Sequence, residues 1–163
     1  MHITGDIMEF AKIERDGDLM WNPDFLSNDP NTRKRIDDIL KQCEDTGWVP
    51  IGCGNRGFVV KHEAAHRVLW FIKDHYHELY LEIADIILAA LKSGKLHRFS
   101  KHATSENLQE AFCDIYGAIY YMPEHSKPQF VRKIHALLES YKIPVMNSNI
   151  PTEEYLIETG VYY

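Results

Sequence analysis

The 163-residue chain carries a net charge of −6, and its 45% share of hydrophobic residues is typical of a soluble globular protein with a single domain, residues 1–163. The negative charge and the scattered lysines and arginines argue against a nucleic-acid partner bound through its phosphates. The sequence shows no signal peptide and no apolar run of about 20 residues, so we expect no membrane partner and a protein that is cytoplasmic as synthesised.

The first predicted element is a β-hairpin in residues 7–21, where Asp16-Gly17 provides the turn signal. A helix is predicted to begin at Pro30, whose missing N–H costs nothing there, and to end at Gly47. A glycine-containing loop, a polar stretch and further apolar residues at helical spacing follow. The loop covers residues 48–57, the polar stretch 95–104, and the later helices begin at Phe58 and span 78–91, 105–121 and 127–141. The chain is therefore predicted to be α+β, with a small N-terminal β-sheet ahead of a mostly helical body.

The helix from Phe58 carries the motif HExxH at His62, Glu63 and His66. Residues four apart lie one turn apart on the same face of a helix, so the two imidazoles can reach one zinc ion at about 2.0–2.1 Å. Glu63 lies to one side of the two ligands, where it can serve as a general base. An ordinary amphipathic helix with two histidines is the competing interpretation, since the motif fixes only three positions.

A third ligand is available in residues 106–121, where Glu106, Glu110 and Asp114 follow each other at four-residue spacing. Three carboxylates on one helix face repel each other in water, and a metal ion facing them would reverse that effect. A solvated acidic face is the alternative interpretation of this spacing. Cys113 is predicted to be a small core residue.

Together these residues resemble the gluzincin branch of the zinc metallopeptidases, in which HExxH is followed by a glutamate ligand on a second helix. The segment "EAFCDIY", residues 110–116, is similar to the E-x-F-A-E-x-F segment of the anthrax-lethal-factor-like peptidase domain, and Asn107 matches an asparagine three residues before the ligand. The segment "GWVPIGCGNRGFVVKHEAAH" is similar to zincin-like metallopeptidase domains of phage minor head proteins and toxins.

This resemblance implies that His62, His66 and Glu110 are zinc ligands, that Glu63 is the general base, and that Asp114 orients a ligand histidine. A shifted register would make Glu106 the ligand and Glu110 the orienting carboxylate. The sequence departs from the family at two positions: Ala65 replaces a usual glycine, and Ala103 replaces the tyrosine that donates to the oxyanion. The candidates to replace that tyrosine as catalytic residues are His102 and Tyr155.

The expected function is that of a zinc metalloendopeptidase, whose partner is a protein or peptide substrate and whose metal-bound water is activated by Glu63. The alternative is a zincin-like domain with a structural or binding role in a phage particle or a toxin-like effector, which would be virion-associated or exported by a dedicated system. A regulatory metallopeptidase of the ImmA/IrrE kind is a third interpretation, based on Met122-Pro123 at the end of the second helix.

Overall fold

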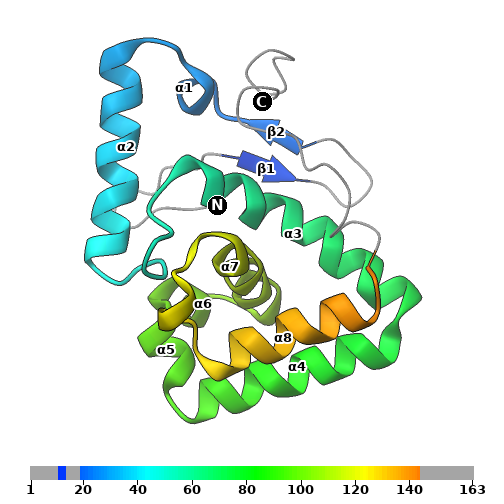
Figure 1. Ribbon diagram of the computed structural model, residues 1–163. Coiled ribbons are helices and arrows are strands. Elements are labelled where there is room, and N and C mark those ends of the chain that lie inside the picture. Colours follow the sequence, from blue (N-terminus) through cyan, green and yellow to red (C-terminus); the bar gives the residue numbers. More distant parts are fainter. Residues whose placement is uncertain (1–10, 14–18, 144–163) are drawn as a thin grey trace.

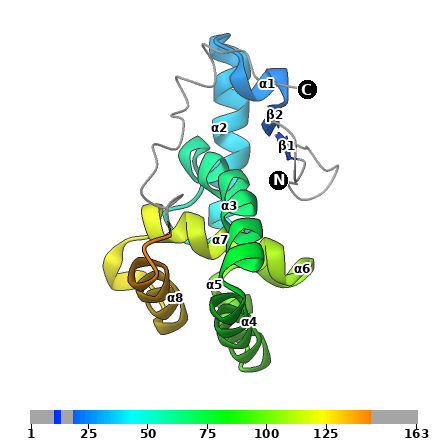
Figure 2. The ribbon, with the colours of Figure 1, turned by 90° about the vertical axis from the view of Figure 1, so that its right-hand side faces the viewer.

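A short antiparallel hairpin opens the part of the chain that the structure, a computed structural model, describes: residues 11–13 and 19–143. Strand β1 (Ala11–Ile13) pairs with β2 (Leu19–Trp21), so that Ala11 lies opposite Trp21. The hairpin lies against the outer side of helix α3 (Arg56–His75), as Figures 1 and 2 show. The short helix α1 (Pro23–Leu26) follows it directly.

The prediction of an α+β fold with an N-terminal sheet layer is wrong, because the described part of the chain is all-α. The two strands have three residues each and form only this hairpin, which is too small to make a layer of the core. Every other element of the described residues is helical. The hydrophobic core is accordingly built between helices.

The remaining α-helices follow the predicted order, with two short ones and a 3-10 helix added. Asp29 caps α2 through a side-chain hydrogen bond from Thr32 N, and Asn55 caps α3 in the same way through Phe58 N. The polar stretch 95–104 contains the two short helices, because Leu96, Phe99 and Ala103 turn into the core. The elements are α2 (Pro30–Asp45), α4 (His77–Lys92), α5 (Lys95–Phe99), α6 (Lys101–Ser105), α7 (Leu108–Tyr121), η1 (Glu124–Ser126) and α8 (Gln129–Ser140).

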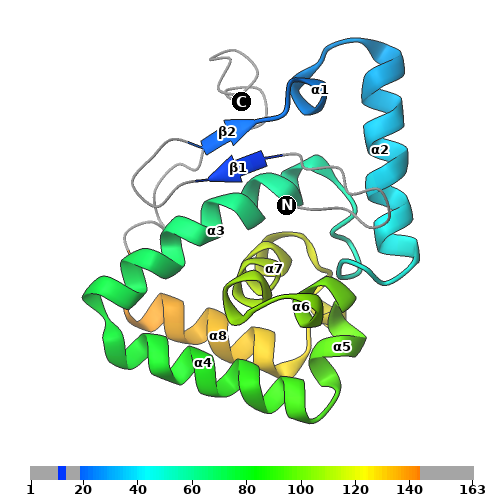
Figure 3. The same cartoon turned by 180° about the vertical axis from the view of Figure 1, so that it is seen from behind.

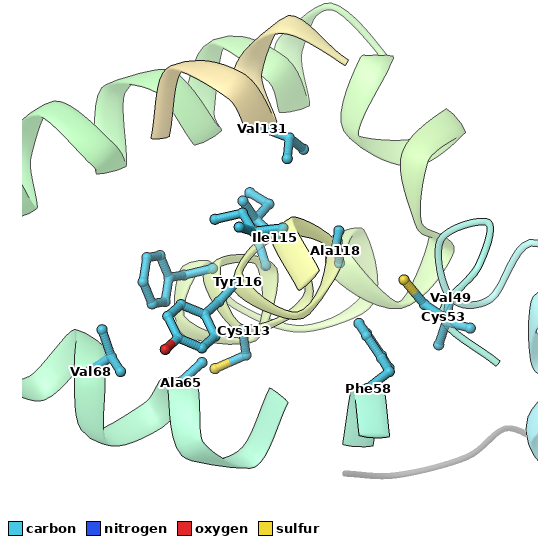
Figure 4. Close-up of a cluster of buried hydrophobic side chains, with 14 of the residues drawn as sticks. Val49, Cys53, Phe58, Ala65, Val68, Cys113, Ile115, Tyr116, Ala118 and Val131 are labelled. Carbon is cyan, nitrogen blue, oxygen red and sulfur yellow. The ribbon is translucent and has the colours of Figure 1, made fainter. Parts of the chain in front are cut away.

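Helices α3 and α7 make the most extensive contact in the described part of the chain. Gly117 allows this approach, since a Cβ atom there would lie 2.5 Å from Cε2 of the buried Phe58 ring. Ala65, which stands where the peptidases that the sequence resembles usually have glycine, is fully buried and faces Cys113 and Tyr116 of α7 (Figure 4). Alanine is thus small enough for this helix contact.

Helix α7 is buried on two sides, with α3 on one and the antiparallel pair α4 and α8 on the other (Figures 1 and 3). Ile115 and Ala118 point toward Val131 of α8, whereas Cys113 and Tyr116 point toward α3 (Figure 4). The polar residues of α7 that share the α3 side are therefore held in the middle of the molecule. None of the helices in the described ranges is long and apolar enough to cross a membrane.

Candidate metal centre

Helix α3 places the three residues of the HExxH motif inside the molecule. His62 is fully buried, Glu63 is 2% exposed and His66 is 8% exposed. The two imidazole rings lie 5.6 Å apart between centroids, and Nε2 of His66 is 3.8 Å from a Glu63 carboxylate oxygen. The motif therefore forms one compact group on the face of α3 that packs against α7.

Helix α7 brings Glu110 to the same group. Asn107 caps α7 by accepting a hydrogen bond from Glu110 N, which fixes the start of the helix three residues before the carboxylate. Glu110 Oε2 lies 2.8 Å from Nε2 of His62, and Oε1 lies 3.6 Å from Nε2 of His66. Of the two carboxylates proposed from the sequence, Glu110 is thus the one in contact with both histidines.

Glu106 does not share a helix face with Glu110 and Asp114, as the four-residue spacing had predicted. It follows the last residue of α6 and is exposed, because α7 begins only after Asn107. Its side chain belongs instead to a group with His102 and Glu110.

Asp114 lies behind His62, one of the two motif histidines. Its side chain is fully buried, and Oδ1 accepts a hydrogen bond from Nδ1 of His62 at 2.8 Å. The other oxygen, Oδ2, is 2.8 Å from Nδ1 of His102 and from the Ser100 hydroxyl, which donates to it. The contact of one carboxylate with two histidines could not be predicted, since α6 was not predicted.

In the second motif histidine, His66, Nδ1 lies 2.8 Å from the side-chain Nε2 of Gln109, an NH₂ group that donates to it. With Nδ1 occupied in both His62 and His66, Nε2 is the nitrogen that each ring directs toward Glu110. Proteins hold the imidazole of a metal ligand in place through an acceptor of its Nδ1–H, as Asp114 does for His62; the Gln109 amide would do the same for His66 through its oxygen.

Cys113 adds a donor that the sequence had placed only in the core. Its sulfur points toward α3 (Figure 4), and donor atoms of His62, His66, Glu110 and Cys113 all lie within 4.8 Å of one another. Tetrahedral ligands of one zinc ion would be roughly 3.3–3.8 Å apart, given ligand bonds of about 2.0–2.3 Å. The spacing of Cys113 three residues after Glu110, on one helix face, was the signal that could have revealed it.

The electrostatics of this group couple a buried imidazole to buried carboxylates. Burial disfavours the charged form of His62, yet hydrogen bonds with Asp114 and Glu110 outweigh it and raise its pKa to about 10. Burial raises the pKa of Glu110, but His62 outweighs this effect and lowers it to about 2. Burial lowers the pKa of His66 and raises that of Cys113 well above the usual range. A positive charge is therefore favoured where the donors meet.

The donor set fits a metal ion. Two imidazoles, a carboxylate and a thiol converge from α3 and α7 in a buried site, and acidic side chains surround them. These groups could hold a metal ion, although the geometry alone does not identify which metal.

Of the two residues proposed to replace the tyrosine of the resembled peptidases, the structure describes only one. His102 is buried on α6 beside the site, with its ring 5.5 Å from that of His62 between centroids. Tyr155 lies outside the described residues. Ala103 is also buried, so a tyrosine at that position would need space that the core does not leave.

A hollow of about 660 Å³ lies elsewhere, between α4 and α8. It is lined in part by Asp85, Ile86, Lys95 and Phe130, and none of the histidines or carboxylates of the metal centre contributes to it. Its lining contains no histidine or cysteine, in contrast to the donor group at the α3–α7 contact.

Comparison of the chain with known proteins gives no match to a protein-family model, to a curated protein or to a solved structure.

Proposed function

We propose that the protein is a zinc-dependent peptidase whose active site is the group formed by His62, Glu63, His66 and Glu110. The observation that carries the proposal is the contact of Glu110 with Nε2 of both motif histidines, at 2.8 and 3.6 Å. A carboxylate from α7 thus completes the ligand set that HExxH begins. The resemblance to gluzincin-type peptidases, seen in the same residues, supports this assignment.

Zinc is the metal that suits this donor set best. Two histidines and one carboxylate are a common ligand set of catalytic zinc sites, which keep another position for water or substrate. Asp114 behind His62 matches the carboxylate–histidine–zinc arrangement that fixes the orientation of the ring. Zinc bound there would act as a Lewis acid on a carbonyl oxygen and would lower the pKa of a water molecule.

Glu63 is placed to move the proton during peptide hydrolysis. Its carboxylate oxygens lie 4.0 Å from Nε2 of His62 and 3.8 Å from Nε2 of His66, beside the donors rather than among them. As the water oxygen forms its bond to the carbonyl carbon, Glu63 accepts a water proton. It then delivers that proton to the nitrogen as the C–N bond breaks. Burial of Glu63 keeps bulk water away from this transfer.

Substrate would reach the group from the side of Glu110, whose side chain is 18% exposed, and of His66, whose side chain is 10% exposed. His62 and Asp114 form the closed side. His102, held by Asp114, is the described residue that could stabilise negative charge on the substrate oxygen in place of the family tyrosine. Tyr155 stays a prediction, as does the site of action in the cytoplasm, a phage particle or outside the cell.

Cys113 favours a second candidate function, a structural zinc site without catalysis. If its sulfur occupies the fourth position, the site is closed, as in structural zinc sites, and no position for water remains. Burial, and after it the surrounding carboxylates, raise the pKa of the Cys113 thiol and oppose its ionisation, which weakens this candidate.

The first test is metal content, measured by elemental analysis of the unaltered protein and of the variants His62→Ala and Glu110→Ala prepared without chelator. We expect bound zinc in the unaltered protein and its loss in both variants. An absence of zinc, even after zinc is supplied to the stripped protein, would overturn the proposal.

Catalysis is tested separately, by mass spectrometry of a mixture of peptides incubated with the zinc-loaded protein. Glu63→Gln should keep the metal and lose cleavage. Cobalt substitution distinguishes the second candidate: a sulfur-to-cobalt charge-transfer band that disappears in Cys113→Ser would identify a closed structural site. Its absence, together with cleavage that depends on Glu63, supports the peptidase.

A further inference from the structure

The metal centre continues into a second group of donors on its partly exposed side. His102, Glu106 and Glu110 offer donor atoms that all lie within 4.8 Å of one another. His102 comes from α6, Glu106 follows the end of α6, and Glu110 belongs to the first turn of α7. Glu110 is shared with the first group, in which its carboxylate faces His62 and His66.

We propose that His102, Glu106 and Glu110 bind a second divalent cation, with the Glu110 carboxylate bridging the two ions. Pairs of metal ions about 3.5–4 Å apart, held by shared ligands, occur in several classes of hydrolase. An imidazole and two carboxylates suit zinc, cobalt or manganese and leave positions open for water.

The orientation of His102 is the first argument. Its side chain is 1% exposed, and Nδ1 makes a 2.8 Å hydrogen bond to Oδ2 of Asp114. Because Nδ1 is engaged in this bond, Nε2 is the ring nitrogen that could bind a cation. Asp114 also accepts a hydrogen bond from Nδ1 of His62, through Oδ1. One buried carboxylate therefore prepares two histidines alike for metal binding.

The charge of the two groups is the second argument. Four carboxylates, those of Glu63, Glu106, Glu110 and Asp114, gather around the histidines. In the described part of the chain no lysine or arginine forms an ion pair with Glu106, Glu110 or Asp114. With neutral histidines, one divalent cation would balance two of the four negative charges, and a second would balance the other two. The buried Glu63 and Asp114 and the mostly buried Glu110 need such compensation, whereas the exposed Glu106 contributes as a ligand of the second group.

The second site also bears on the proposed reaction. A cation bound to Nε2 of His102 would provide positive charge beside the first site, where the family tyrosine is missing and His102 alone would otherwise act. The two roles use the same nitrogen, so ligation by His102 excludes direct donation from it to the substrate. The inference rests on the proposed function in one respect, the sharing of Glu110.

The test is the zinc stoichiometry of the chelator-stripped full chain, measured by isothermal titration with zinc chloride and checked by elemental analysis after dialysis. The variant is Glu106→Gln, which changes an exposed side chain outside the core. Glu82→Gln is the matched control, because Glu82 is an exposed glutamate of α4 that forms no ion pair within the described part of the chain. We expect two zinc ions per chain in the unaltered protein and the control, and one in Glu106→Gln.

One zinc ion per chain in the unaltered protein, or two in Glu106→Gln, would overturn the second site and leave the first intact. No zinc in any of the three proteins would overturn the proposed function together with this inference. The stoichiometry therefore separates the two failures.

Discussion

The substitution Asp114→Asn tests the network that orients the histidines. Asp114 accepts hydrogen bonds from His62, His102 and Ser100, each 2.8 Å long, and its side chain is fully buried. Asparagine has nearly the same shape, but one of its two polar groups is an NH₂ donor. That donor must face an N–H of a histidine or force the ring into its other tautomer, with Nε2–H aimed at the metal position.

The substitution should lower both the metal affinity and the folding stability. Loss of a carboxylate behind a ligand histidine typically lowers metal affinity about 10–100-fold, equivalent to about 1.4–2.7 kcal/mol. Breaking a buried charge pair from one side costs about 3–5 kcal/mol of folding stability, so the metal-free variant should also melt at a lower temperature. Asp85→Asn, at an exposed position of α4, is the matched control and should change neither quantity.

The measurement is competition for zinc with a chromophoric chelator, accompanied by thermal unfolding followed by circular dichroism. A zinc affinity in Asp114→Asn equal to that of the unaltered protein would refute the orienting role, even if the melting temperature fell. A lowered affinity with an unchanged melting temperature would show that the carboxylate orients the ligand without contributing to the stability of the core.

The metal-free protein should lose stability between pH 6.5 and about 10, because the pKa of His62 is raised from 6.5 to about 10 and the folded form alone keeps the proton in that interval. The slope should reach about 1.4 kcal/mol per pH unit, and thermal melts of stripped protein that stay constant or rise with pH would contradict it. Gly117→Ala should destabilise the fold by about 1–2 kcal/mol, since overpacking against Phe58 exceeds the gain in helix propensity. Urea unfolding measures this change, and a stabilised variant would show that α3 and α7 separate easily.

Much of the helical body could be predicted from local signals. Apolar residues at helical spacing and Pro30 as the first residue of α2 act within one or two turns, so a single sequence contains them. The fold class could not be predicted in this way. Whether the hairpin near the N-terminus extends into a sheet depends on partner strands elsewhere, and the described part of the chain supplies none.

The residues of the candidate metal centre also differ in whether local sequence signals predict them. The HExxH motif is local, and the four-residue step from Glu110 to Asp114 is local as well, so both could be found. The contribution of His102 could not, because it depends on α6 folding back so that His102 and Asp114 meet in the core. Glu106 was assigned to the wrong helix because the start of α7 is set by the side chain of Asn107.

The close contact between α3 and α7 determines the arrangement of the buried donor residues, whose polar side chains are costly to bury. Asp114, His62 and Cys113 have no exposed surface, and they lie where the close contact at Gly117 and Phe58 presses α3 onto α7. Moving either helix would leave carboxylates without their imidazole partners, which costs several kcal/mol for each unpaired charge. The helix contact therefore specifies the donor geometry. In turn, cations at the donors would tie the two helices together, because binding that requires the folded arrangement adds to its stability.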